Sequence, residues 1–239
     1  MSLVMVPLII GLEVVLVVVA VHFWKKARNA QRERFIHSYM FPRGIDDKLR
    51  QMHPTLDAKQ FQLIARALRQ FFMAHLKSDH GFVAMPSQAA DDLWHEFILY
   101  TRNYEAFCKQ AFGGFMHHTP AVALGADRRN NTGLRRVWWF ACKEENINPR
   151  HATRLPLLFA LDSKLGLANG FSYALDCKAA TTGQTPVPYC GGDLGGETSS
   201  YSFESSGCGG GSVDSSSSDG GGSDGGGGCG GGCGGGGGD

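Results

Sequence analysis

The chain has 239 residues and is nearly neutral, with 23 Lys and Arg against 22 Asp and Glu. This balance lacks the strongly basic character of nucleic-acid-binding domains, so no nucleic-acid partner is predicted. Whole-chain averages hide three unlike segments, which are an apolar start, a mixed middle of the size of one domain, and a Gly/Ser-rich end.

The first segment, residues 1–24, is predicted to be a transmembrane helix. Residues 3–24 are almost entirely apolar, and at 1.5 Å per residue they extend about 33 Å, enough to cross a hydrocarbon core of about 30 Å. Nothing basic precedes this run, as a secretory signal peptide would require. Glu13 lies near the middle of this run. It either contacts a partner helix or serves a proton-linked site, or it is a protonated side chain without a function, and both interpretations stay open.

A basic cluster follows the apolar run and predicts the orientation of the chain. It consists of Lys25, Lys26, Arg28, Arg32 and Arg34. Positive residues are retained on the cytoplasmic side of membranes, so we expect a single-pass protein whose soluble domain is cytoplasmic. Residues 25–44 are interpreted as a basic juxtamembrane helix and connector that stops before Phe41-Pro42, because proline disfavours helix in the residue ahead of it.

Residues 45–177 predict a compact all-helical domain. The first helix is expected over residues 45–52, and the second begins after a cap at Thr55 or Asp57. The third, central helix is expected to run from an N-cap at Ser87 to Gly113, and the fourth begins after a cap at Thr132 or Asn131. The fifth is expected to have Pro156 at its first helical position and to end at Gly166. The central helix after Ser87 carries Leu93, Phe97, Tyr100, Tyr104 and Phe107 at helical spacing. Strand-like alternation is absent or very short, so the fold class is mainly α.

Residues 178–239 predict a disordered Gly/Ser/Cys-rich tail. This segment holds almost nothing apolar to bury, so folding could not offset its ordering entropy. Cys190, Cys208, Cys229 and Cys233 lie in it and should stay reduced in the cytoplasm. Cys108 and Cys142 lie on predicted helices beside apolar positions and are interpreted as small buried hydrophobic residues.

One group of polar residues in the middle segment could carry chemistry. Asp91 and His95 are four residues apart, so they share a helix face, and His117 and His118 follow a glycine break that lets the chain return to that face. A carboxylate with two or three histidines suits a divalent metal such as Zn. In the competing structural interpretation, Asp91 accepts a hydrogen bond from His95, and the histidines pack or shape a turn. Metal-free acid–base catalysis by the same groups is a third interpretation.

A family resemblance rests on the run from residue 85 to residue 120, residues 155–167 and the Gly/Cys tail. These segments resemble uncharacterised bacterial membrane proteins with a glycine-rich C-terminus. They are distantly similar to the glycine-rich domain-containing proteins of plants and fungi, which carry a similar Asp-x-x-Trp-His element. Asp91, Trp94 and His95 match this element, and Glu96 departs from it. The resemblance implies an architecture and a bacterial inner-membrane location, and it implies no reaction.

The function predicted from the sequence is a membrane-anchored helical domain that serves as an interaction or scaffold module. Its expected partners are the lipid bilayer and another protein. The first alternative is a metal-dependent enzyme with a site around Asp91, His95 and His117 or His118. The second is a tail that acts as a modified or metal-binding Gly/Cys segment. Whether the protein is an enzyme stays open at this point.

Overall fold

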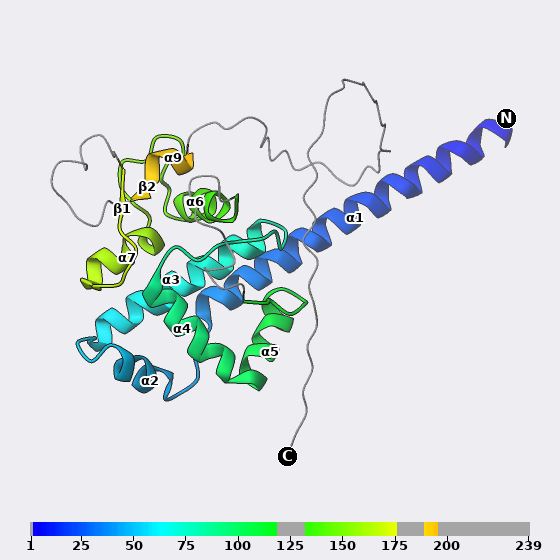
Figure 1. The fold of residues 1–239 in the computed structure, drawn as a ribbon. Helices are drawn as coiled ribbons and strands as arrows, with labels where there is room; N and C mark the ends of the chain where they lie inside the picture. The colour runs from blue at the N-terminus through cyan, green and yellow to red at the C-terminus, as the bar shows by residue number, and fades with distance from the viewer. Residues whose placement is uncertain (1, 119–131, 176–188, 196–239) are drawn as a thin grey trace, which may run out of the picture. The chain divides into compact units, whose positions relative to one another are not determined.

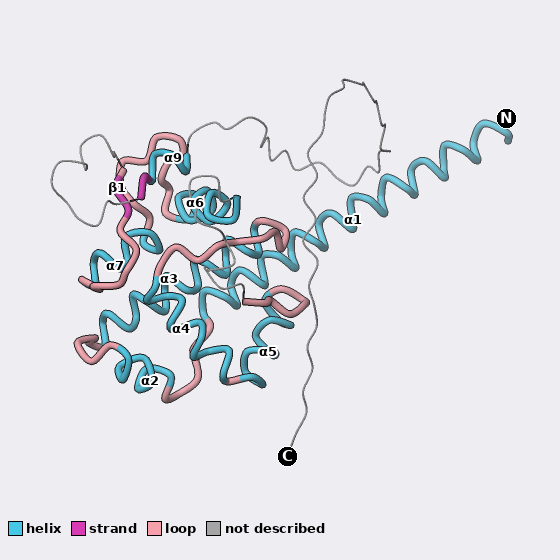
Figure 2. Tube along the Cα trace, in the orientation of Figure 1, coloured by secondary structure: helices cyan, strands magenta, loops and turns pink. Residues whose placement is uncertain are grey.

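The structure is a computed structural model that describes residues 2–118, 132–175 and 189–195, all within one compact unit (Figure 1). These residues are mainly helical, as predicted. The strands among them are β1 (Tyr173–Ala174) and β2 (Tyr189–Cys190), which pair in parallel with Tyr173 opposite Tyr189. Figure 2 shows how little strand the described residues contain compared with helix.

Helix α1 (Ser2–Ser38) is continuous through the predicted span and the basic cluster. Its C-terminal part packs against α3 and α5 and buries Ile36 completely. The large apolar side chains between Leu12 and Trp24 are 44–64% exposed. Figure 1 shows no other described element beside the N-terminal half of α1.

Among the helices of the described residues, none combines the length and the apolar character that crossing a membrane requires. The transmembrane helix expected over residues 1–24 therefore stays a prediction.

Helix α3 lies at the centre of the domain. The preceding α2 (Ile45–Met52) has the predicted bounds and begins after Gly44, whose φ of 86° is one that glycine tolerates. Of the two caps predicted for the next helix, Thr55 and Asp57, it is Asp57 that caps α3 (Ala58–Lys77), through a capping box with Gln60. Because α3 packs against α1, α4, α6 and α7, its apolar residues are buried almost all round.

The predicted central helix is in fact two helices. Ser87 caps α4 (Gln88–Leu99) as expected, but the helix ends at Tyr100, and α5 (Thr101–Ala111) begins at once. The break turns α5 onto α1, where the Phe107 ring lies 4.7 Å from that of Tyr39. Periodicity could not reveal this bend, because the apolar spacing continues through it.

Two further helices complete the core. Thr132 is the first residue of α6 (Thr132–Glu144), and Asn131 lies outside the described residues. Pro156 is the N-cap of α7 (Leu157–Leu165) and not its first residue, while Gly166 closes α7 with a φ of 65°. The Trp138 ring of α6 contacts the Phe159 ring of α7 edge to face at 5.1 Å.

Part of the segment predicted as a disordered tail has a defined structure. Strand β2 is followed by the short helix α9 (Gly191–Gly195), which packs on α6 and buries Leu194. Leu194 supplies the apolar contact that the glycines around it lack, so this piece gains enough burial to order. Residues 178–188 and 196–239 of the predicted tail lie outside the described residues, and with them Cys208, Cys229 and Cys233.

Candidate metal centre

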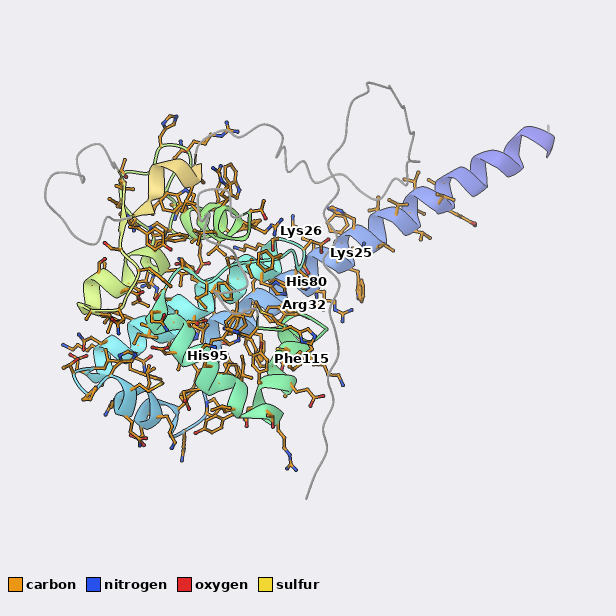
Figure 3. The ribbon with its side chains drawn as sticks, in the orientation of Figure 1. Lys25, Lys26, Arg32, His80, His95 and Phe115 are labelled. Carbon is orange, nitrogen blue, oxygen red and sulfur yellow. The ribbon has the colours of Figure 1, made fainter. Side chains whose placement is uncertain are left out.

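Helix α4 places Asp91 and His95 on one face, one turn apart. Asp162 and Ser87 anchor the N-terminus of this helix, and Trp94 is buried on the adjoining face. His95 Nδ1 lies 3.7 Å from Asp91 Oδ2, which is beyond hydrogen-bonding distance. The His95 side chain is 51% exposed and that of Asp91 is 15% exposed, so the pair opens to solvent on the His95 side. Figure 3 labels His95 on this helix.

His118 reaches the same face from the loop that follows α5. Its Nε2 lies 2.9 Å from Asp91 Oδ1, and its ring contacts those of Trp94 and His95 at 4.4 and 4.3 Å. The loop is held in place because Tyr104 donates a hydrogen bond to the Met116 carbonyl at 2.6 Å and accepts one from Trp94 Nε1 at 3.1 Å. Asp91 therefore bonds His118, and not His95 as the structural interpretation supposed.

His117 lies outside this group. Its side chain is exposed and its ring contacts that of Phe115 at 4.9 Å. It lines a separate cavity of about 220 Å³ together with His75, Trp94 and apolar side chains. Of the two neighbouring histidines that the sequence left open, the structure brings only His118 to Asp91.

Asp91, His95 and His118 form the group whose geometry suits a metal ion. One ligand atom from each lies within 4.8 Å of the other two. Ligand atoms about 2.1 Å from a tetrahedral ion lie about 3.4 Å apart, so the widest separation in the group must shorten by up to about 1.4 Å, which rotation of the half-exposed His95 ring can supply. The Asp91 and His118 atoms, which are hydrogen-bonded at 2.9 Å, must move apart by about 0.5 Å to admit the ion.

A second His–Asp pair stands beside this group and was not predicted. His53, at the end of α2, bonds Asp92 at 2.7 Å, and Gln88 donates to the other oxygen of the same carboxylate at 2.8 Å. Adjacent aspartates on α4 thus bond histidines from two different segments. In the sequence, His53 is an isolated histidine, and its spacing from Asp92 gives no sign that the two residues meet.

Asp162 is a further polar residue that the sequence reading missed. It is 2% exposed and accepts hydrogen bonds from the Ser87 hydroxyl and from the backbone N–H groups of Gln88, Ala89 and Phe171. Asp162 therefore holds the start of α4 against α7. The residues that it bonds in α4 lie about one helical turn before Asp91. The sequence shows Asp162 as a single carboxylate among the apolar residues of α7. Such a carboxylate is stable in a core only when it is hydrogen-bonded, so this position could have predicted a buried polar contact.

Burial favours the neutral forms of three titratable groups near the core, which are His75, Cys108 and Cys142. Burial lowers the pKa of His75 to about 4, despite a hydrogen bond to the Gly81 carbonyl that raises it, and His80 and Arg136 lower it further. Burial also raises the pKa of the Cys108 thiol, and raises that of Cys142 to about 12. Both cysteines are fully buried, as predicted, and neither is a thiolate ligand in this environment.

The comparisons with known proteins agree with the extent of the folded unit. The family model described as UCP032817-like matches residues 31–194, a range that ends in α9. This match covers more than half of the chain, so the protein belongs to the UCP032817-like family. Neither the curated proteins nor the solved structures gave a match.

Proposed function

We propose that the helical domain binds a divalent metal ion, with Zn as the first candidate, through Asp91, His95 and His118. The observation that carries the proposal is the approach of one ligand atom from each residue to within 4.8 Å of the others. Carboxylate oxygen and imidazole nitrogen are ligands that Zn accepts. The Asp-x-x-Trp-His element, which resembles that of glycine-rich domain-containing proteins, supplies two of the three ligands.

The ligand number favours a metal-dependent enzyme over a structural metal site. Structural zinc sites use four protein ligands, whereas catalytic sites use three and leave a position for water or substrate. The half-exposed His95 leaves the group open to solvent on one side. A zinc ion there would lower the pKa of a bound water and make it a nucleophile near neutral pH.

Metal binding is tested with the full-length protein purified in a neutral detergent. We expect about one equivalent of metal by elemental analysis, loss of the metal in EDTA with a lower melting temperature, and recovery with added Zn or Mn. The variants His95→Ala and His118→Ala should bind the ion at least about 100-fold more weakly, since each removes a ligand. His117→Ala is the matched control, because that histidine is adjacent but exposed and outside the group, and it should bind metal normally.

The other candidate function is the interaction or scaffold module, in which the polar residues only position the chain. The bonds of His118 to Asp91 and of His53 to Asp92 favour it, because they satisfy both carboxylates without an ion. In that case the purified protein holds no stoichiometric metal and EDTA leaves its melting temperature unchanged. His118→Ala would then cost about 1–3 kcal/mol of stability with no link to metal.

We propose further that the N-terminal half of α1 anchors the domain in the bacterial inner membrane, with residues 25–239 in the cytoplasm. The exposed apolar side chains between Leu12 and Trp24 support the anchor, and the basic cluster that begins at Lys25 supports the orientation. Figure 3 labels Lys25, Lys26 and Arg32 of this cluster on α1.

The anchor predicts how the protein fractionates and labels. The full chain should stay with membranes in alkaline carbonate, and a chain lacking residues 1–24 should be released. An impermeant thiol reagent should not reach Cys229 or Cys233 in intact cells. Release of the full chain by carbonate would reject the anchor, and labelling in intact cells would reject the orientation.

A further inference from the structure

An open groove of about 1150 Å³ lies between the C-terminal part of α1, α3, α6 and α7, and it does not include the candidate metal ligands. Its volume is slightly larger than the usual range for small-molecule sites, about 300–1000 Å³. Cations dominate its lining, which includes Arg66, Arg69, Lys77, Lys143, Arg154 and Lys164. The carboxylates that line it are Glu144 and Glu145.

Among the described residues, ion pairs neutralise only two of these cations, Arg154 and Lys77. Glu145 is fully engaged by Gln70, Arg154 and the Leu157 N–H, and Lys77 lies 3.7 Å from Glu33. Within the described residues, no ion pair involves Arg66, Arg69, Lys143 or Lys164. Four positive charges therefore face one remaining carboxylate, that of Glu144.

The titration of groups in the groove shows the same imbalance. Burial raises the pKa of Glu144, and Glu145 and Glu33 raise it further, while Lys77 and Arg66 lower it. Burial lowers the pKa of His37, and Lys77, Arg69 and Arg66 lower it further against the opposing effect of Glu33, so cations outnumber carboxylates around His37.

Arg69 supplies an independent sign that the groove favours an anion. Its guanidinium donates to the Tyr39 carbonyl at 3.0 and 2.6 Å and lies over the Phe41 ring, so it is fixed in position. Burial lowers its pKa, and its partners among the described residues include no carboxylate. A half-buried cation bonded only to neutral groups carries an uncompensated desolvation cost, which a bound anion relieves.

We infer that this groove binds an anionic ligand with two or more phosphate groups, which the cations contributed by α3, α6 and α7 would hold. Arginine and lysine side chains form charge-assisted hydrogen bonds with phosphate, and several cations along a groove match several phosphates better than one. The ligand is either a soluble phosphorylated molecule or a lipid headgroup.

The length of α1 favours the soluble source, an argument that rests on the membrane anchor proposed above. From Trp24 at the end of the apolar run to His37 in the groove, the helix rises about 20 Å. A bilayer headgroup layer is only about 5–8 Å deep on each side, so a groove at this height lies beyond it.

The test measures binding of sodium triphosphate to the full-length protein in neutral detergent with EDTA present, by titration calorimetry. We expect binding that weakens as salt is raised, because the contacts are ionic. The double variant Arg66→Ala/Lys143→Ala should bind about tenfold more weakly or worse. Both side chains are exposed, so its melting temperature should match that of the wild type.

Two controls make the result specific. Arg102→Ala/Lys109→Ala removes the same charge from exposed positions on α5, outside the groove, and should change the affinity less than twofold. His118→Ala should bind triphosphate normally, which separates this groove from the candidate metal centre. Absence of triphosphate binding, or equal loss in the α5 variant, would overturn the inference.

A second arm distinguishes the two sources of phosphate. Mixed micelles with cardiolipin, whose headgroup carries two phosphate groups, are compared with micelles that contain only phosphatidylcholine. Competition of cardiolipin with triphosphate, lost in Arg66→Ala/Lys143→Ala, would support the groove and assign it to a headgroup. Failure to compete, with triphosphate still bound, supports the soluble ligand. The inference would be overturned if the protein bound lipid but not triphosphate, and if Arg66→Ala/Lys143→Ala left the lipid binding unchanged.

Discussion

Asp162→Ala should lower the free energy of unfolding by about 3–5 kcal/mol. The substitution leaves four donors without their acceptor, which are the Ser87 hydroxyl and the N–H groups of Gln88, Ala89 and Phe171. Each buried donor left unsatisfied costs about 1–3 kcal/mol, and partial relaxation reduces the sum. The loss is a large part of a stability that is typically 5–15 kcal/mol. Urea unfolding followed by circular dichroism measures it.

Two companion variants separate the causes. Asp162→Asn keeps the shape but replaces one acceptor oxygen with a donor, so its loss should be smaller than that of alanine and still clear. Glu105→Ala removes a carboxylate from an exposed position of α5 and should change stability by less than about 0.5 kcal/mol. A stable Asp162→Ala protein would show that water or neighbouring groups replace the carboxylate at the start of α4.

Phe97→Ala should destabilise the domain by about 3–5 kcal/mol, the usual cost of truncating a buried aromatic side chain. Phe97 is fully buried, and its ring centroid lies 5.2–5.5 Å from those of Tyr39, Phe41, Tyr104 and Phe107. These rings come from the connector after α1 and from α5, so the cavity would loosen several contacts at once. Thermal and urea unfolding both report the loss.

Leu99→Ala is the matched control, because this leucine lies two residues further along α4 and is 71% exposed. Its replacement should change stability by less than about 0.5 kcal/mol. Phe97→Leu keeps most of the volume and should fall between the wild type and the alanine variant. Equal stabilities of the Phe97 and Leu99 alanine variants would contradict the packing described for α4.

The sequence located most of the helices because their ends are set by nearby residues. Asp57 and Ser87 cap the helices that follow them, and Gly166 closes α7, as their positions in the chain predicted. The burial of Phe97, Cys108 and Cys142 followed from helical spacing in the same way. The break at Tyr100 was invisible, because it is imposed by packing of α5 against α1.

Of the candidate metal ligands, two could be placed together from the sequence and the third could not. The sequence by itself determined that Asp91 and His95 share a face, because four residues make about one helical turn. Only the tertiary structure decided that His118 and not His117 joins them, because a hydrogen bond from Tyr104 to Met116 sets the direction of the loop. The tertiary structure alone also assembles the cationic groove, because its residues from α3, α6 and α7 come together only through helix packing. Local periodicity acts over a few residues, whereas sites built from distant segments depend on how the helices pack.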